Sequence, residues 1–321
     1  MFGRRKDDVN AFVSKPVPPL VEPGTITIVP GFTNRATPDA MDRLTSLAST
    51  VYVAKDAKVL YVQVPKSACT TMLWTMVDLA GLDHDSLAFS TWESVSASQS
   101  IHDPAIHPVP TIDQVSGKVR AKALTSPKWM RLAVIRDPYA RLYSAWESRV
   151  LLANPGPWLD FPQAELVRQG DSIDVVASFR AFLDVMVEHQ GIWQSNPHFA
   201  QQVYVMALDE IDYTDIVPTS GLTDLFDRLG DRIGRPLTPE RHNEGLGIKP
   251  EQVYDARTAA LCEQMFDADF DRLGFARRTF TAPERVVLEG SSARLLTMVR
   301  ERNERISALS RHRCSKAKHS S

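Results

Sequence analysis

Two short segments of the chain carry residue types that could bind phosphate groups. The first spans residues 59–72 and reads VLYVQVPKSACTTM. It combines an apolar run typical of a buried strand, a tight loop with one lysine, and the beginning of a helix. The second spans residues 131–146 and reads RLAVIRDPYARLYSAW. It has the same order, with Arg136 where the strand ends and Ser144 eight residues later in the helix.

Both segments bring cationic and hydroxyl donors to the N-terminus of a predicted helix. A helix N-terminus binds phosphate through its free backbone N–H groups and through the helix dipole. Small residues in the first loop would let the backbone approach a bound phosphate closely. The predicted phosphate-binding residues of this loop are Lys66, Ser67, Ala68, Cys69, Thr70 and Thr71. Two such sites in one chain indicate a ligand with phosphate groups at both ends.

In the second loop, the forked guanidinium of Arg136 could bind a phosphate bidentately. Pro138 suits the first turn of the helix that follows. Each residue also has an ordinary structural explanation. Arg136 could pair with Asp137, Ser144 could be a small packing residue, and Lys66 could be a solvated lysine in a turn. The joint spacing of Arg136 and Ser144 favours phosphate binding.

A nucleoside-triphosphate P-loop would need the pattern GxxxxGK[ST]. The first loop lacks both glycines of that pattern, which argues against hydrolysis of ATP or GTP and against a small-molecule kinase. The kinase nevertheless stays as a less favoured alternative at this point.

Residues 65–71 resemble the 5′-phosphosulfate loop of carbohydrate sulfotransferases (sulfotransferase family 2). The Ala-Cys-Thr version is similar to the group of chondroitin 4-sulfotransferase and the HNK-1 sulfotransferase. Residues 136–146 resemble the 3′-phosphate segment of that group, RxPxxRxxSx followed by an aromatic residue. Weaker similarity continues at residues 196–199, 212–229 and 242–243, and at 268–270 with 274–275. The animal relatives carry a membrane anchor and disulfides, and neither is expected in this chain. The resemblance is therefore to a bacterial, soluble type of member.

The resemblance implies transfer of a sulfuryl group from 3′-phosphoadenosine 5′-phosphosulfate to a hydroxyl of a glycan, glycolipid or small metabolite. It implies that Lys66 contacts the 5′-phosphate oxygens with Thr70 and Thr71, and that Arg136 and Ser144 hold the 3′-phosphate. The chemistry agrees, because such a transfer depends on positioning and on charge stabilisation of a departing phosphate. No metal ion is implied.

The acceptor hydroxyl needs a general base. Relatives often supply a histidine or glutamate between the two loops, and His102 is favoured here for its Ile-His-Asp context. The pKa of an ordinary histidine suits base catalysis near neutral pH. The alternatives are a surface role for His102, or His107, His198 or Glu93 as the base. Phe199 replaces the usual tryptophan, and Ser220-Gly221 stands where many relatives carry glutamate.

Composition is that of an ordinary globular protein, with 43% hydrophobic and 24% charged residues. A net charge of −2 gives no global basic field, so nucleic acid is not expected as a partner. The three cysteines are widely spaced and odd in number, which favours a reducing compartment. No apolar run approaches the roughly 18 residues of a membrane span, and the N-terminus has no signal-peptide core. We therefore expect a cytoplasmic protein without a transmembrane segment.

Strands that alternate with helices predict an α/β fold with a central, mainly parallel sheet flanked by helices. The resemblance implies that this is the P-loop-like sulfotransferase fold. We divide the chain into a flexible lead-in (1–24), a sulfotransferase domain (25–282) and a C-terminal helix with a basic tail (283–321). Further strands are predicted at 25–29, 203–206 and 214–217. Further helices are predicted at 38–48, 70–81, 139–152, 173–188, 222–233 and 256–273.

The C-terminal segment 283–311 has an apolar stripe at helical spacing, interrupted by Arg302. The stripe is formed by Leu288, Leu295, Val299, Ile306 and Leu309. It could pair with a second copy of the chain to give a homodimer, or the helix could fold back on its own domain. A further alternative to the enzyme is a non-catalytic nucleotide-binding scaffold that acts through this helix.

Overall fold

The computed structural model describes residues 48–84, 97–102, 107–155, 166–188, 196–238, 245–281, 283 and 285–318. The strand predicted at 25–29, the helix predicted at 38–48 except its last residue, the lead-in, Glu93 and residues 242–243 lie outside these ranges. None of the helices in the described part of the chain is long and apolar enough to cross a membrane.

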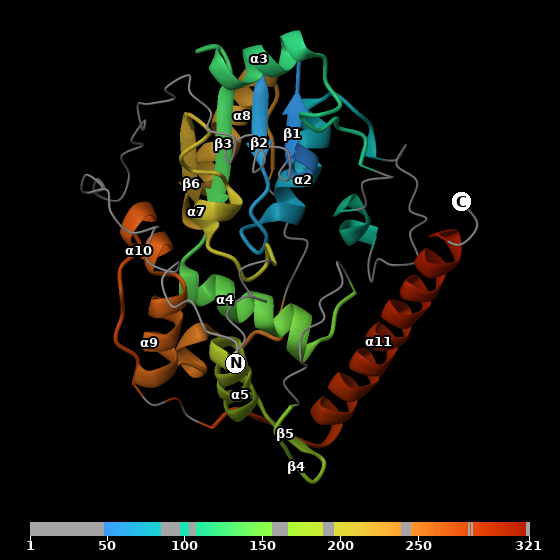
Figure 1. The fold of residues 1–321 in the computed structure, drawn as a ribbon, viewed down its shortest axis with the longest axis vertical. Coiled ribbons are helices and arrows are strands. Elements are labelled where there is room, and N and C mark those ends of the chain that lie inside the picture. The colour runs from blue at the N-terminus through green and yellow to red at the C-terminus, as the bar shows by residue number, and fades with distance from the viewer. Residues whose placement is uncertain are drawn as a thin grey trace, which may run out of the picture.

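A four-stranded sheet forms the upper half of the molecule (Figure 1). Its strand order is β1-β2-β3-β6, from β1 (Val51–Ala54), β2 (Val59–Val62), β3 (Met130–Ile135) and β6 (Asp215–Pro218). The edge strand β1 is antiparallel to β2, while β2, β3 and β6 run parallel to one another. The α/β fold with a parallel central sheet is therefore confirmed. The parallel strands end together, so the loops that follow β2 and β3 meet at one edge.

Both faces of the sheet are covered, as a mostly parallel sheet requires. Alternate residues of β2 and β3 contribute to two separate hydrophobic clusters, because side chains along a strand point to opposite faces. Helices α2 (Cys69–Leu79) and α8 (Leu222–Ile233) cover one face. Helix α3 (Gly117–Thr125) and residues 206–213 cover the other.

The lower half of the molecule contains a third hydrophobic cluster, built around α4 (Pro138–Trp146). A small sheet of order β4-β5-β7 lies at the lower end (Figure 1). The remaining elements are η1 (Ala48–Thr50), η3 (Ala97–His102), the π-helix η4 (Glu147–Leu151), β4 (Arg168–Gln169), β5 (Ser172–Asp174), α5 (Val175–Glu188), α7 (Gln202–Val205), η5 (Thr219–Gly221), η6 (Pro250–Gln252), α9 (Ala256–Met265), α10 (Asp267–Leu273), β7 (Val287–Leu288) and α11 (Gly290–Lys318).

The strand predicted at 203–206 is wrong, because this segment forms the single helical turn α7. Its Val-Tyr-Val pattern is typical of a strand. The buried carboxylate of Asp269, however, accepts hydrogen bonds from the backbone N–H groups of Gln202 and Val203, both at 2.9 Å. A carboxylate that binds the first N–H groups of a turn acts as a helix N-cap, so this distant contact overrides the local propensity.

Two predicted helices are also divided in the structure. The helix predicted at 256–273 is broken at Phe266 into α9 and α10. There the Gln201 amide donates to the Met265 carbonyl at 3.0 Å, and a side chain that takes a helical carbonyl can interrupt the helix. The helix predicted at 139–152 ends as an α-helix at Trp146 and continues as one π-helical stretch to Leu151.

The C-terminal helix α11 packs on its own chain along its first half. Ala293 and Leu296 belong to the lower hydrophobic cluster, and the buried Asn303 amide donates to the Leu152 carbonyl at 2.8 Å. Two large apolar side chains of this half, Leu295 and Met298, are instead 61% and 64% exposed. These contacts match the fold-back alternative for residues 293–303. The exposed side chains leave the homodimer as a prediction.

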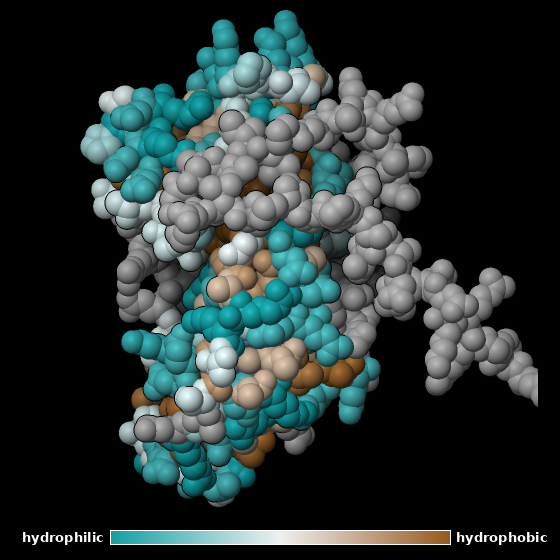
Figure 2. All heavy atoms as spheres, turned by 90° about the vertical axis from the view of Figure 1, so that its left-hand side faces the viewer, coloured by the Kyte–Doolittle hydropathy of each residue, from teal (hydrophilic) through white to brown (hydrophobic). Residues whose placement is uncertain are grey.

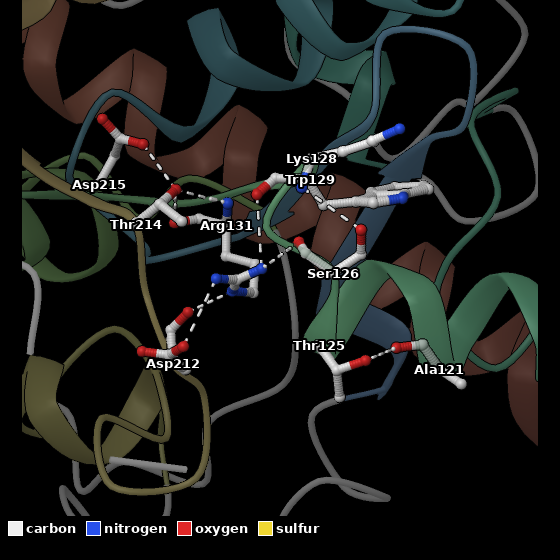
Figure 3. A network of polar contacts seen from close by, with 9 residues as sticks. All are labelled: Ala121, Thr125, Ser126, Lys128, Trp129, Arg131, Asp212, Thr214 and Asp215. Atoms are coloured by element: carbon white, nitrogen blue, oxygen red, sulfur yellow. Dashed lines mark hydrogen bonds and ion pairs between the residues drawn. The ribbon is translucent and has the colours of Figure 1, made fainter. Parts of the chain in front are cut away.

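The amino end of β3 is tied to its surroundings through Arg131, a buried arginine (Figure 3). Its guanidinium donates to the Ser126 carbonyl at 3.0 Å and lies 3.5 Å from the Asp212 carboxylate. Its backbone N–H donates to the Thr214 hydroxyl at 2.9 Å. These bonds join β3 to the segment that leads into β6 and fix the relative position of the two strands.

The surface seen in Figure 2 is mainly hydrophilic where the structure describes it, with smaller hydrophobic areas between the polar ones. No large apolar face stands out on this side. The loops that follow the carboxyl ends of β2 and β3 remain the strongest candidates for a functional site.

Candidate functional site

The loop after β2 has the backbone of an anion-binding turn. Lys66 and Ala68 both adopt left-handed conformations, with φ of 67° and 57°. Non-glycine residues rarely adopt such angles, and where they do the surrounding structure imposes them. Ala68 is the N-cap residue of α2 and has no side-chain oxygen, so no side chain caps this helix. The first turn of α2 can therefore offer its N–H groups to a bound anion.

The loop after β3 is shaped by Asp137 and Pro138. The Asp137 carboxylate accepts a hydrogen bond from the Ala140 N–H at 3.0 Å and caps α4, while Pro138 occupies its first turn. Asp137 is thus used in capping α4 and in an ion pair with Arg278 at 3.0 Å, not in a pair with Arg136. Arg136 instead donates to the Lys66 carbonyl at 3.1 Å. The two predicted phosphate loops are in direct contact.

Gln202 of α7 holds the two loops together, and no local sequence pattern points to it. It is fully buried. Its amide oxygen accepts from the Arg136 N–H at 2.9 Å and from the Ser67 hydroxyl at 3.3 Å, and its amide nitrogen donates to the Arg136 carbonyl at 2.8 Å. The Asp269 carboxylate in turn accepts a hydrogen bond from the Gln202 backbone N–H and so fixes the position of Gln202. This buried network determines the spacing between the loops.

Arg141 is a second connecting residue that the sequence analysis left without a role. Its buried guanidinium donates to three backbone carbonyls: Pro65 at 3.0 Å, Ala200 at 2.7 Å and Pro197 at 2.8 Å. It therefore joins the first phosphate loop, α4 and the segment 196–200. The sequence indicated Arg141 only by its position in the RxPxxR motif. The folded chain shows which carbonyls it binds.

His102 lies beside the first loop although it is 36 residues from Lys66 in the sequence. Its Nε2 is 2.8 Å from the Thr70 hydroxyl and its Nδ1 is 3.2 Å from the Gln63 amide nitrogen. Because an amide nitrogen can only donate, Nδ1 is the unprotonated nitrogen and Nε2 carries the proton. His102 also contacts Cys69. Burial raises the pKa of that thiol, but His102 and Lys66 lower it more, to about 6.

The other predicted bases are less well placed. Burial lowers the pKa of His107 to about 4, and its ring packs on Tyr52 with centroids 4.4 Å apart. Burial and the charge of Arg149 lower the pKa of His198 well below its ordinary value. The His198 Nδ1 lies 3.2 Å from the Asn196 side-chain oxygen, so it carries the proton. Its unprotonated Nε2 accepts from Arg149 at 2.9 Å and is not free to take another proton.

Three cations lie close together at this edge of the sheet: Lys66, Arg136 and Arg149. Burial lowers the pKa of Lys66, and the charges of Arg149 and Arg136 lower it further, to about 7, against the opposing charges of Cys69 and Glu147. Burial also lowers the pKa of Arg136 and Arg149. None of the three forms an ion pair with a carboxylate of the described residues. Cations that have no ion-paired carboxylate are suited to bind an anionic ligand.

The structure thus brings together Lys66, Ser67, Cys69, Thr70, His102 and Arg136, as the positions of the two loops predicted. Ser144 lies on α4 and Thr71 on α2, each on the helix that follows its loop. Among the described residues, no group of three or more His, Cys, Asp or Glu side chains is arranged to hold a metal ion.

A family model described as the sulfotransferase family matches residues 49–235, more than half of the chain. This chain belongs to the sulfotransferase family. The match contains both predicted phosphate loops, His102, Gln202 and the four strands of the central sheet. No curated protein and no solved structure matches the chain at a significant level.

Proposed function

We propose that this sulfotransferase-family protein moves a sulfuryl group from 3′-phosphoadenosine 5′-phosphosulfate to a hydroxyl of a glycan, glycolipid or small metabolite. The observation that carries the proposal is the contact between the two loops. Arg136 donates to the Lys66 carbonyl, and both loops are held by the same buried Gln202 amide. Two cationic loops at this fixed spacing suit a ligand with a phosphate at each end.

The residues present fit such a donor. The uncapped N-terminus of α2 and the Lys66 ammonium would hold the 5′-phosphate, while Arg136 and Ser144 would hold the 3′-phosphate. When bound, the donor supplies the sulfuryl group and a phosphate that can leave. A charged Lys66 would stabilise the negative charge that grows on the leaving phosphate oxygen.

His102 is the proposed general base. Its unprotonated Nδ1 faces the Gln63 amide, and an acceptor hydroxyl would replace this amide as the donor to Nδ1. The hydrogen bond from Nε2–H to Thr70 would keep the ring oriented and fix the tautomer. This arrangement lets the protein remove the hydroxyl proton without a metal ion.

The finer assignments belong to the same proposal. The P-loop-like type of fold is supported by the three parallel strands whose carboxyl ends carry the site. Similarity to the chondroitin 4-sulfotransferase and HNK-1 sulfotransferase group rests on residues 65–71 and 136–146. A reducing, cytoplasmic environment is supported by Cys69 and Cys262, which are both unpaired.

The test is a comparison of two nucleotides by thermal unfolding. 3′-Phosphoadenosine 5′-phosphate, the donor without its sulfuryl group, should stabilise the native protein by about 2.7 kcal/mol at one hundred times its dissociation constant. ATP at the same concentration should stabilise the protein much less. Equal stabilisation by ATP would contradict the proposed donor. Turnover of labelled donor against a panel of hydroxyl acceptors would then identify the second substrate.

A further inference from the structure

Arg149 is a half-buried arginine with unused hydrogen-bond donors. It lies in the π-helix η4, one and a half turns beyond Ser144. Its Nη1 donates to the carbonyls of Asn154 at 3.1 Å and Pro155 at 2.7 Å, and its Nη2 donates to His198 Nε2 at 2.9 Å. A guanidinium has five N–H donors, so two remain. The Nε group is buried and has no partner among the described residues.

The partners of Arg149 hold it in place without neutralising its charge. Two are backbone carbonyls, and the third is a histidine whose lowered pKa keeps it uncharged. In the described part of the chain no carboxylate forms an ion pair with it. A cation that is partly removed from water without a counter-charge is costly, and a binding site is the usual place where such a cost is retained.

The charge of Arg149 acts on Lys66 in particular. It is the strongest electrostatic influence that lowers the Lys66 pKa, ahead of Arg136. Burial is the main cause of the lowered Arg136 pKa, and the charges that act on Arg136 are those of Asp137 and Glu147. The contacts of Arg141 agree with this position: Arg141 binds the carbonyls of Pro65 and Pro197, which directly precede Lys66 and His198, and His198 accepts from Arg149. Arg149 therefore lies on the Lys66 side of the site, where the proposed function puts the 5′-phosphate.

We propose that Arg149 binds the sulfo oxygens of the donor, beside Lys66 and on the acceptor side of the 5′-phosphate. This inference rests on the proposed function and extends it by one residue. A planar guanidinium with two unused N–H groups can bind two oxygens of a sulfo group at once. Arg149 would thus recognise the group that is transferred and hold it in line for the acceptor.

Arg300 provides a matched control. It is half-buried and donates to the carbonyl of Leu151 at 3.0 Å, in the same π-helical segment. Unlike Arg149, it is paired with a carboxylate, that of Glu304 at 3.2 Å. Loss of either arginine removes a contact that ties this segment to the rest of the chain, but only loss of Arg149 removes an unpaired cation from the site.

The experiment measures the dissociation constants of 3′-phosphoadenosine 5′-phosphosulfate and of its desulfated form by calorimetry without an acceptor. For Arg149→Gln, the affinity for the sulfated nucleotide should fall about tenfold more than the affinity for the desulfated one. Arg149→Lys, which keeps the charge and loses the fork, should give a smaller change in the same direction. Arg300→Gln should leave the ratio of the two affinities unchanged.

Equal loss of affinity for both nucleotides in Arg149→Gln, or no loss for either, would overturn the role of Arg149. If Arg149→Gln fails to fold in a thermal melt, Arg149→Lys decides in the same way. Failure of the proposed function gives a different result, because the wild-type protein would then bind neither nucleotide.

Discussion

The two ends of the central sheet differ in how their arginines are paired: Arg131 at the amino end is buried, and Arg136 and Arg149 at the carboxyl end are half-buried. At the amino end, Arg131 is 4% exposed and lies 3.5 Å from the Asp212 carboxylate (Figure 3). At the carboxyl end, Arg136 and Arg149 bind backbone carbonyls and a neutral histidine, and neither pairs with a carboxylate of the described residues.

The difference distinguishes the structural arginine Arg131 from the two arginines that are proposed to bind the donor. A buried cation that has its own carboxylate is already satisfied, so it can only hold the fold together. A cation bound to neutral acceptors keeps its charge available. Burial lowers the pKa values of Lys66, Arg136 and Arg149. It also lowers that of Arg141, whose three carbonyl contacts connect the loops, so a lowered pKa alone does not identify a binding residue.

His102→Ala should give the largest effect of the variants considered at the carboxyl end. Loss of a general base should lower the transfer rate roughly 10²-fold to 10⁴-fold, while the affinity for the desulfated nucleotide stays close to normal. The control is His84→Ala, because this histidine is 44% exposed and pairs with Asp78 away from the loops. A near-normal rate in His102→Ala would remove His102 from the role of base.

Arg131→Met should have its effect on stability alone. Removal of one partner of a buried ion pair should lower the free energy of unfolding by about 3 kcal/mol, at the lower end of the usual range because Asp212 is 32% exposed. Denaturant unfolding measures this change. Nucleotide affinity should stay the same. A large loss of affinity in a folded Arg131→Met protein would break the distinction between the two ends of the sheet.

The pH dependence of nucleotide binding should report the charge of Lys66. Its pKa is about 7 in the free protein, and a bound phosphate favours the charged form and raises that pKa. Binding then takes up a proton above pH 7, so the affinity for the desulfated nucleotide should fall by up to about tenfold per pH unit. Arg149, Cys69, Arg136 and Glu147 are the charged groups that act on Lys66.

Two variants separate the sources of this pH dependence. Lys66→Arg stays charged throughout, so its affinity should be nearly constant above pH 7. Cys69→Ser removes the thiol whose pKa is about 6, and it should keep most of the decline. A decline that survives in Lys66→Arg and disappears in Cys69→Ser would assign the titration to Cys69.

Much of the fold could be predicted from the sequence where the pattern is local. The helix α8 has the predicted limits, and β2, β3 and β6 lie within a few residues of the predicted strands. Each has a clear apolar period and a turn at its end. The edge strand β1 was missed. The turn α7 was misread because it is fixed by Asp269, which lies 67 positions after Gln202.

The residues of the candidate site also divide into those that a local sequence pattern indicates and those that it does not. Lys66, Arg136 and Ser144 could be singled out as candidates because each stands at a fixed distance from the end of its own strand, and their roles stay predictions. Gln202 and Arg149 could not be predicted, because their roles depend on partners that are distant in sequence or on a π-helical stretch. A buried glutamine or a second arginine in a helix has no local pattern that distinguishes it.

The most direct test of the account combines one protein change with one ligand change. Calorimetry would measure the dissociation constants of 3′-phosphoadenosine 5′-phosphate and of adenosine 5′-monophosphate for the wild type and for Arg136→Ala. The wild type should prefer the nucleotide with the 3′-phosphate by about 10-fold to 100-fold, the value of a charge-assisted contact. Arg136→Ala should lose most of this preference. Equal affinity of the wild type for both nucleotides, or an undiminished preference in Arg136→Ala, would contradict the assignment of the two loops to the two ends of one donor.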